Sequence, residues 1–386
     1  MAPGEHPAGS AQEEVGHGDV VRGDTSRDDT SRDDTARDAA VVALRRVAFL
    51  LERGRATSYR PAAFRTAARA VEAESPAAVR DLVGRDALTE LAGVGPRTAE
   101  VAAQAARGEP VAYLERLEAE AETLPPSQVP GSPEPDEATV AAARALRERL
   151  RGDLHAHTEA SDGATPVQEM VLAALELGHD YVAITDHSPR LTVARGLSPE
   201  RLRAQMAALE ALGRAVAPFR VLRGIEVDVL DDGSLDQEPE LLDALDVVVA
   251  SVHSKLRMDE RAMTRRMLTA VADPRTDVLG HCTGRQVTGR GRPESTFDAR
   301  AVFEACAEHG VAVEISCRPD RLDPPHALLD VAVEAGCLFS IDTDAHAPGQ
   351  LDWLMAGCVR AVQHGIGPER VVTTRTAEDL LAGFRR

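Results

Sequence analysis

The apolar positions divide the chain into a helical N-terminal part and a longer part in which strands alternate with helices. From Ala39 onward, apolar residues recur every three or four positions, at Val41, Leu44, Val47 and Leu51. This spacing places them on one face of an amphipathic helix. The same periodicity predicts further helices at 61–71, 76–82 and 137–150.

Beyond residue 151, short apolar runs alternate with amphipathic helical segments. After the stretch GDLHAH, the runs are YVAITDH, FRVLRGIEVDV, DVVVASVHS, DVLGHC, VAVEIS and LFSIDTDAH. A repeated strand-then-helix pattern is typical of a parallel sheet, and this many units favours closure into a barrel. We therefore predict an α/β protein in which a β/α barrel follows a small all-α domain.

Two segments lack apolar periodicity. Residues 1–38 are polar and acidic and contain the repeat RGDTS-RDDTS-RDDTA, so we expect disorder there. Residues 125–135, PPSQVPGSPEP, predict a proline-rich linker. The sequence therefore predicts four parts. They are an acidic tail (1–38), a helical domain (39–120), a linker with a short helix (121–150) and a barrel (151–386).

Residues of the types that bind metal ions follow almost every predicted strand. They are His155, His157, Asp162, His187, Glu226, His253, His281, Asp344 and His346. The strand at 311–316 is the exception and supplies no evident ligand. Because active sites of β/α barrels gather at the C-terminal ends of the strands, we expect all nine side chains to converge.

Mixed histidine and carboxylate ligands suit zinc, manganese or iron, and no thiolate is present to require zinc. Nine ligands exceed the three or four that one catalytic ion uses, so we expect two or three divalent ions that share a bridging carboxylate. Such ions lower the pKa of a bound water from about 15.7 toward 7 and neutralise phosphate oxygens. Hydrolysis of a phosphate ester is the chemistry that this set of residues predicts.

The motifs that carry these ligands resemble those of the PHP (polymerase and histidinol phosphatase) domain. They are DLHAHTEASDG, ITDHS, GIEVD, SVHS, GHCTGR and DTDAH. The resemblance covers residues 151–386 and implies a seven-stranded distorted β/α barrel with a trinuclear metal site. RGDLHAHTEASDG, ARGLSPERL and EISCRPDRLD are similar to the branch found in bacterial family X DNA polymerases. One departure is Ser316-Cys317, where that branch would have Asn-Ala, which puts the fit of the substrate in doubt.

The resemblance also implies how the ligands are shared. One ion would be held by His155, His157, Glu226 and Asp344, a second by Glu226, His253 and His281, and a third by Asp162, His187 and His346. Glu226 would then be the bridging, catalytically essential carboxylate.

Arginines near the strand ends are candidates to bind the phosphate, because a guanidinium can pair with two phosphate oxygens. Arg285 and Arg290 follow the strand that ends at His281, and Arg321 follows the strand without a ligand. Lys255, the one lysine of the chain, is a weaker candidate.

The segment LAGVGPRTAEVAAQAA predicts a helix, a tight turn and a second helix, and it resembles a helix-hairpin-helix DNA-binding element. Gly93 and Gly95 would let backbone amides approach a phosphate at the start of the second helix. An ordinary turn between packed helices is the alternative. RGRATSYRPAAFRTAARAVE is similar to the N-terminal domain of family X polymerases, so Arg60, Arg65 and Arg97 are further candidates for DNA contacts.

The catalytic region of such a polymerase has no counterpart, because few residues separate Leu117 from the barrel and no paired-aspartate strand motif lies among them. Lyase chemistry through a Schiff base is not expected either, since residues 39–120 contain no lysine.

Composition and charge limit the cellular compartment in which we expect the protein. The chain of 386 residues has a formal net charge of −19, most of it in residues 151–386, whereas 39–74 hold seven arginines against three glutamates. No apolar run could span a bilayer and no signal peptide is evident, so we expect neither membrane nor secretion. Five cysteines without a pairing motif predict reduced thiols in the cytoplasm.

These observations predict a metal-dependent phosphoesterase that acts at DNA ends or abasic sites in DNA repair. It would be a 3′–5′ exonuclease, a 3′-phosphatase or an abasic-site endonuclease. The alternative is a small-molecule phosphatase of the histidinol-phosphate type. A DNA-binding scaffold without catalysis is disfavoured because the ligand set is complete.

Overall fold

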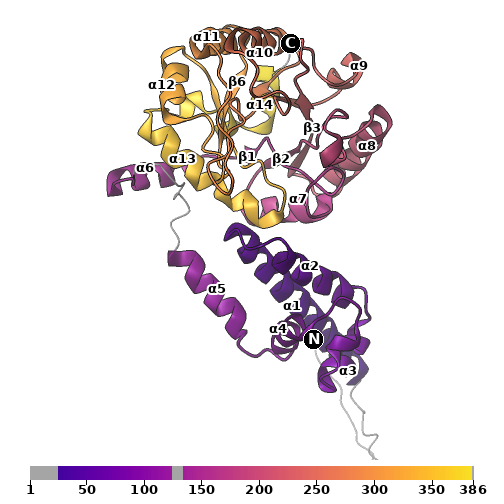
Figure 1. Ribbon diagram of the computed structural model, residues 1–386. Helices are drawn as coiled ribbons and strands as arrows, with labels where there is room; N and C mark the ends of the chain where they lie inside the picture. Colours follow the sequence, from indigo (N-terminus) through magenta and orange to yellow (C-terminus); the bar gives the residue numbers. More distant parts are fainter. Residues whose placement is uncertain (1–24, 124–133, 385–386) are drawn as a thin grey trace, which may run out of the picture.

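Seven parallel strands lie side by side in chain order in the computed structural model, which describes residues 25–123 and 134–384 (Figure 1). They are β1 (Gly152–Asp153), β2 (Tyr181–Ile184), β3 (Arg220–Asp228), β4 (Val247–Ser251), β5 (Val278–Leu279), β6 (Ala312–Ser316) and β7 (Phe339–Asp342). β2 and β4–β7 are buried along their whole length, as expected where helices cover the outside of a parallel sheet. All seven coincide with apolar runs predicted from the sequence.

The first and last strands meet at the end of the sheet where the predicted ligands lie. Ala156 and Ala345 form a parallel bridge, and the His157 N–H donates to the Ala345 carbonyl at 2.7 Å. Closer to the middle, the Leu154 N–H donates to Asp342 Oδ1 at 2.8 Å. The sheet thus curls into a nearly closed barrel, and the predicted fold class is confirmed.

Helices surround this barrel (Figure 1). They are α6 (Glu137–Arg147), α7 (Val167–Glu176), α8 (Pro199–Ala215), α9 (Pro239–Leu242), α10 (Glu260–Ala272), α11 (Ala299–His309), α12 (His326–Glu334), α13 (Leu354–Gln363) and α14 (Ala377–Phe384), with 3₁₀ turns η2 (Thr192–Ala194), η3 (Pro348–Trp353), η4 (Pro368–Arg370) and η5 (Val372–Thr374). Several begin where the sequence supplies a capping side chain: Ser198, Asp259 and Asp298 accept hydrogen bonds from the first turns of α8, α10 and α11.

The N-terminal helices form a separate lobe, here called the head (residues 25–123). It contains α1 (Thr25–Arg53), α2 (Tyr59–Glu72), α3 (Pro76–Gly84), η1 (Leu88–Glu90), α4 (Pro96–Ala106) and α5 (Ala112–Thr123). α1 begins at Thr25, inside the segment 1–38 that was expected to be disordered. A single 3₁₀ turn, η1, stands where a helix was predicted before the glycine turn. Residues 1–24 and most of the predicted linker, 124–133, lie outside the described residues.

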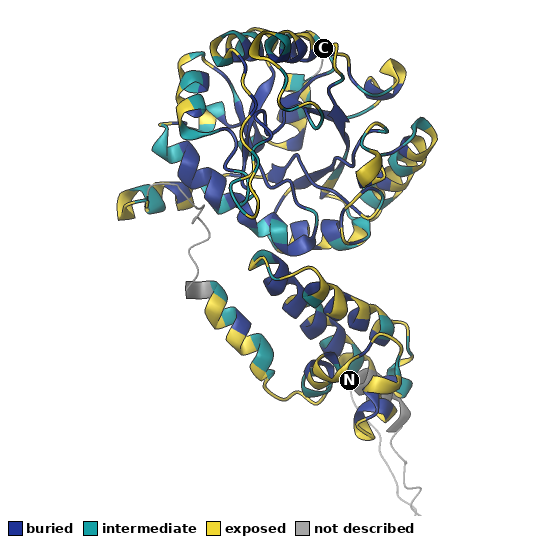
Figure 2. Cartoon of the chain, in the orientation of Figure 1, coloured by how far each residue is buried: buried dark blue, intermediate teal, exposed yellow. Residues whose placement is uncertain are grey.

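The head is docked on the barrel through η3. Apolar residues of α1 and of the barrel belong to one continuous core, which includes Leu44 and Leu351. Figure 2 shows buried residues both in the head helices and in the part of the barrel that faces them. Gly349 allows the close approach, because a Cβ there would lie 2.0 Å from the Phe49 carbonyl oxygen. The Trp353 indole N–H donates to a backbone carbonyl of α1 at 2.9 Å. The predicted head and barrel therefore share packing that neither could complete alone.

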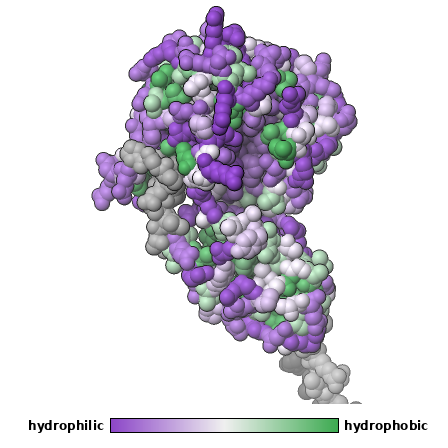
Figure 3. Space-filling view, viewed as in Figure 1, coloured by the Kyte–Doolittle hydropathy of each residue, from purple (hydrophilic) through white to green (hydrophobic). Residues whose placement is uncertain are grey.

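The face of the molecule seen in Figure 3 is mainly hydrophilic, with small separate hydrophobic patches. Among the described helices, none combines the length and the apolar character needed to cross a membrane.

Candidate metal centre

All nine predicted metal ligands converge at the C-terminal ends of the strands. They form four overlapping groups, and within each group one ligand atom per residue lies within 4.8 Å of the others. The groups are His157–Asp162–His187–His346, His155–Glu226–His281, His155–His157–Asp344 and His187–Glu226–His253. Because these groups share members, the geometry suits several neighbouring ions better than one.

Glu226, on β3, stands at the centre of the cluster and is 1% exposed. Its Oε1 lies 2.9 Å from His281 Nε2 and 3.1 Å from His253 Nε2. Its Oε2 lies 2.9 Å from His187 Nδ1 and 3.4 Å from His155 Nε2. Oε2 also lies 3.5 Å from His157 Nε2. The two oxygens thus face different sets of imidazoles, which is the arrangement that a carboxylate bridging two ions requires.

Two aspartates extend the cluster to either side. Asp344 Oδ1 lies 3.3 Å from His157 Nε2. Asp344 itself has φ of 51°, a left-handed conformation that is uncommon for a residue with a side chain and concentrates at functional sites. Asp162 Oδ1 lies 3.4 Å from both His187 Nε2 and His346 Nε2.

Within the described part of the chain, many ligand atoms are buried without a hydrogen-bond partner. They include both oxygens of Glu226, both ring nitrogens of His157, His253 and His281, Nε2 of His155 and Nδ1 of His187. Burying so many polar atoms is costly unless something binds them. Divalent cations fit this donor set, because imidazole nitrogens and carboxylate oxygens are their usual ligands.

The protonation of the cluster leads to the same conclusion. Burial would raise the pKa of Glu226, but the imidazoles of His253, His155 and His187 hold it well below its usual range. Burial and repulsion from His346 and His187 lower the pKa of His157 to about 3. An ionised carboxylate beside a neutral imidazole is the protonation state in which both side chains could bind a metal ion.

The centre is most open to solvent beside Asp162 and His346, and less so at His253, whose side chain is 13% exposed. The side chains of His155, His157, Glu226, His281 and Asp344 are at most 1% exposed, whereas those of Asp162 and His346 are 35% and 20% exposed. A substrate group that reaches the ions would approach past Asp162 and His346.

The strand without a predicted ligand, β6, contributes a carboxylate that the sequence reasoning missed. Glu314 is fully buried, its Oε2 accepts from the His281 N–H at 2.7 Å, and it lies 3.3 Å from His155 Nδ1. The contact with His155 Nδ1 is of the kind that fixes the ring orientation of a metal-binding histidine, whereas the contact with His281 is to its backbone N–H. The available signal was a lone acidic residue inside the apolar run VAVEIS. Asp228 acts similarly, 3.4 Å from His253 Nδ1.

The predicted phosphate-binding arginines have different positions. Arg321 is at the centre: its Nε lies 3.1 Å from Asp344 Oδ2, and its buried Nη1 has no partner among the described residues. Arg285 instead donates from Nε to the Arg321 carbonyl at 3.0 Å, so it supports the loop. Arg290 is exposed on the loop after β5. Lys255 is exposed and paired with an aspartate at 2.5 Å.

Arg318 is a further arginine at the centre, and sequence reasoning missed it. Its Nη1 lies 3.3 Å from Asp344 Oδ2 and 3.0 Å from His346 Nδ1. The unusual pair Ser316-Cys317 just before it is buried, and a Cβ at Gly357 would meet the Cys317 sulfur at 2.5 Å. That pair therefore bears on how α13 packs against β6, and it does not line the open side of the centre.

The predicted hairpin is present as a turn between η1 and α4. Gly93 has φ of 85°, which favours glycine, and Gly95 precedes α4. The Gly95 N–H already donates to Thr98 Oγ1 at 2.9 Å, which leaves it unavailable to a phosphate in this conformation. Arg97 follows on the surface, where it pairs with Glu100 at 2.8 Å.

The other two predicted DNA contacts lie on α2. Arg60 is half-buried and donates to the Tyr113 hydroxyl at 2.9 Å. Arg65 is 5% exposed, and its guanidinium pairs with Glu52 and with Glu169 of α7, at 2.7 Å in each case. Arg65 therefore lies in the contact between head and barrel, with its hydrogen-bonding edge occupied.

Fold and site together define a β/α barrel with a cluster of candidate ligands for several metal ions at its mouth. Residues 153–318 match the family model of the PHP domain. The chain therefore carries a PHP domain, and this domain is of the metal-dependent phosphoester hydrolase type.

Two relatives illustrate the range of similar proteins. DNA polymerase/3′-5′ exonuclease PolX of Bacillus subtilis is 36% identical over 238 residues, which are 62% of this chain and 41% of PolX. The chain thus spans less than half the length of PolX. Probable phosphatase YcdX of Escherichia coli O139:H28 is 29% identical over 205 residues, which are 50% of this chain and 78% of YcdX. Histidinol phosphate phosphatase of Lactococcus lactis, solved with zinc, L-histidinol and phosphate, gives a TM-score of 0.40 at 17% identity, over 56% of this chain and 94% of that one.

Proposed function

We propose that this chain is a DNA-repair phosphoesterase that hydrolyses phosphate esters at strand ends or abasic sites. The observation that carries the proposal is the buried cluster around Glu226, most open at Asp162 and His346 and flanked by arginines. The predicted activities remain 3′–5′ exonuclease, 3′-phosphatase and abasic-site endonuclease. The similarity to PolX and the docked helical head favour DNA as the substrate.

The residues of the chain have distinct roles in this proposal. When bound, divalent ions would lower the pKa of a shared water toward 7 and so supply hydroxide at neutral pH. Glu226 would hold two of the ligand groups together. The unpartnered Nη1 of Arg321 would donate to a non-bridging phosphate oxygen, where negative charge accumulates during attack. Arg318 would keep Asp344 and His346 in place.

Hydrolysis of a small phosphomonoester such as histidinol phosphate is the second candidate. The similarity to YcdX favours it, because the match covers 78% of that protein and so needs no head. The cytoplasm is the compartment we propose for either function, since the five cysteines are buried free thiols.

The test is activity of the full chain, reloaded with manganese or zinc and with its metal content measured by elemental analysis. Substrates should be oligonucleotides with a recessed 3′ end, a 3′-phosphate or an abasic site, alongside L-histidinol phosphate and p-nitrophenyl phosphate. We expect two or three ions per chain and cleavage of at least one DNA substrate. Rapid turnover of histidinol phosphate without any cleavage of DNA would favour the second candidate.

A further inference from the structure

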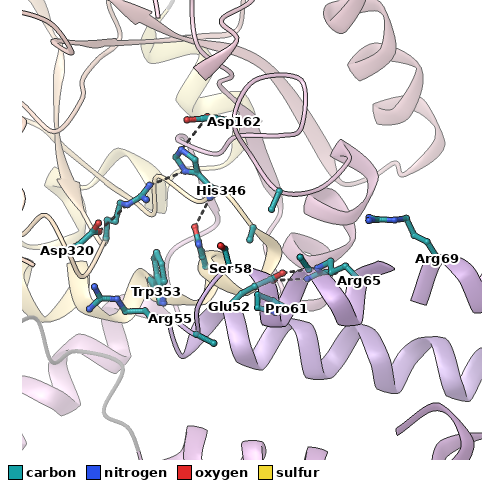
Figure 4. Close-up of a pocket in the computed structure, with 16 residues that line it drawn as sticks. Glu52, Arg55, Ser58, Pro61, Arg65, Arg69, Asp162, Asp320, His346 and Trp353 are labelled. Atoms are coloured by element: carbon teal, nitrogen blue, oxygen red, sulfur yellow. Dashed lines mark hydrogen bonds and ion pairs between the residues drawn. The ribbon is translucent and has the colours of Figure 1, made fainter. Parts of the chain in front are cut away.

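A cleft of about 390 Å³ lies between the head and the open side of the metal centre (Figure 4). Its barrel wall includes the metal-ligand candidates Asp162 and His346, together with Arg318. Its head wall includes Arg55 and Ser58 from the loop between α1 and α2, and Arg65 and Arg69 from α2. The head therefore forms the wall that faces the open side of the metal centre.

We propose that this cleft binds the last unpaired nucleotide of a DNA strand, with Arg55 and Arg69 contacting the backbone phosphates beside it and Tyr59 stacking on a base. The inference rests on the proposed function, because it supplies the metal centre with a polynucleotide substrate. It gives the head a part in building the active site rather than a separate DNA-binding task.

The exposure of the ligands determines where a substrate must lie. Asp162 and His346 are the most exposed of the nine candidates, and both line the cleft. A strand whose terminal phosphate reaches the ions from this most exposed side places its adjoining nucleotide in the cleft.

The four arginines of the cleft are not equally free to bind phosphate. Arg65 is held between Glu52 and Glu169, and Arg318 is held by Asp344 and Asp320. These two arginines have carboxylate partners that a phosphate would have to displace.

Arg55 and Arg69, in contrast, retain available hydrogen-bond donors. Arg55 is exposed and makes one long contact, 3.5 Å to Thr288 Oγ1. Arg69 has a side chain that is 46% exposed and lies 3.5 Å from Glu169, which already pairs with Arg65 at 2.7 Å. They lie at opposite ends of the head wall (Figure 4), so one strand could contact both. Two such arginines beside a metal centre are notable in a chain with a net charge of −19.

The size of the cleft favours a single strand, and an exposed aromatic ring adjoins a lining residue in the chain. Its volume is at the lower end of the roughly 300–1,000 Å³ usual for small-ligand sites, which suits about one nucleotide and not a duplex. Tyr59, next to Ser58 in the chain, is 73% exposed. Stacking of a base on an exposed aromatic ring contributes about 1–3 kcal/mol and tolerates any sequence.

The test compares Arg55→Gln, Arg69→Gln and the double variant with Arg214→Gln, an exposed arginine of α8 paired with Glu210. Each is assayed on an oligonucleotide with a single-stranded 3′ end and on p-nitrophenyl phosphate. We expect the double variant to raise KM for the oligonucleotide at least tenfold at low salt, with the difference shrinking as salt increases. Hydrolysis of p-nitrophenyl phosphate should be unchanged, and Arg214→Gln should behave as the unmodified chain.

Tyr59 supplies an independent measurement. Tyr59→Ala should weaken binding of the oligonucleotide several-fold in fluorescence anisotropy, and Tyr59→Phe should restore it, because the ring is kept. Thermal unfolding of each variant checks that the fold is intact.

The outcomes separate this inference from the proposed function. Cleavage of DNA by the unmodified chain, with KM unchanged in the double variant, would overturn the cleft and leave the function standing. A chain that hydrolyses p-nitrophenyl phosphate but neither cuts nor binds oligonucleotides would overturn both.

Discussion

The barrel mouth and the head both bury charged side chains, but they differ in whether those side chains have hydrogen-bond partners. At the barrel mouth, Glu226 and the imidazoles around it are buried with ligand atoms that lack partners among the described residues. In the head, Arg65 is just as buried, but each edge of its guanidinium meets a carboxylate of Glu52 or Glu169. Burial without partners indicates a site that awaits a ligand, and burial with partners indicates structure.

The comparison also explains why a cluster of arginines in a sequence is a weak guide to DNA binding. Arg60, Arg65 and Arg69 all lie on α2, yet their surroundings differ. Arg65 holds the head on the barrel, Arg60 is bonded to Tyr113, and Arg69 remains available. The function of each depends on what packs against its face of the helix.

The largest effect that would test this comparison is expected at Glu226. Glu226→Gln should lower turnover of p-nitrophenyl phosphate by at least about a thousandfold, because a neutral amide bridges two cations poorly. Elemental analysis should find fewer ions bound per chain. Glu210→Gln, on the exposed face of α8, is the matched control and should change neither quantity. Normal turnover in Glu226→Gln would show that the cluster is not the catalytic centre.

Arg65 should give the largest effect on stability. Arg65→Gln leaves two carboxylates in the head–barrel contact without their partner, a change that typically costs about 3–5 kcal/mol. Urea unfolding should show this loss, and Arg97→Gln on the surface should stay within about 0.5 kcal/mol of the unmodified chain. Unchanged stability in Arg65→Gln would show that Arg65 does not stabilise the contact between head and barrel. Arg65 would then again be a candidate for a DNA contact.

The fold and the ligand set could be predicted because both depend on local patterns. A strand in a parallel barrel is an apolar run, and a side chain that directly follows such a run must lie at the barrel mouth. His281 directly after DVLG is an example, and His187 follows YVAIT after one intervening residue, Asp186. Seven strands placed in this way bring the nine ligand candidates together without any knowledge of long-range packing.

What could not be predicted depends on contacts between distant segments. Glu314, like Glu226, lies inside its strand, but no ligand motif marks it in the sequence. Only the inward direction of its side chain brings it to the backbone N–H of His281 and to His155 Nδ1. Arg318 reaches Asp344 because of the path that the chain takes after β6. The docking of the head depends on Gly349, whose lack of a side chain has meaning only when α1 packs against it.

A smaller effect is expected from a buried histidine outside the metal centre. Burial and the nearby Arg147 lower the pKa of His179 to about 3, so its ring is neutral in the folded chain. The unfolded chain binds a proton near the ordinary pKa of about 6.5, so this contribution to stability is complete above that pH and is lost as pH falls. At pH 5 the loss amounts to about 2 kcal/mol.

His179→Gln should therefore flatten the fall in unfolding free energy of the metal-free chain between pH 7 and pH 5. The exposed His309→Gln on α11 should not, and turnover at pH 7 should survive in both variants. An equal pH dependence in the unmodified chain and in His179→Gln would mean that the ring titrates normally when folded.

The smallest effect is expected at Glu314, a buried carboxylate of which one oxygen has hydrogen-bond partners and the other has none among the described residues. One of its oxygens accepts from the His281 N–H at 2.7 Å, while Oε1 has no partner among the described residues. Glu314→Gln keeps the size of the side chain and one acceptor oxygen, but it removes the negative charge beside His155. Removing an outer partner of a metal ligand typically costs about 10–100-fold in metal affinity or activity.

For Glu314→Gln we expect the lower end of this range, measured as the zinc or manganese concentration that restores half of the activity after chelation. Saturating metal should recover most of the turnover, which Glu226→Gln should never do. If excess metal fails to rescue Glu314→Gln, then Glu314 binds an ion directly, and β6 contributes a tenth ligand to the centre.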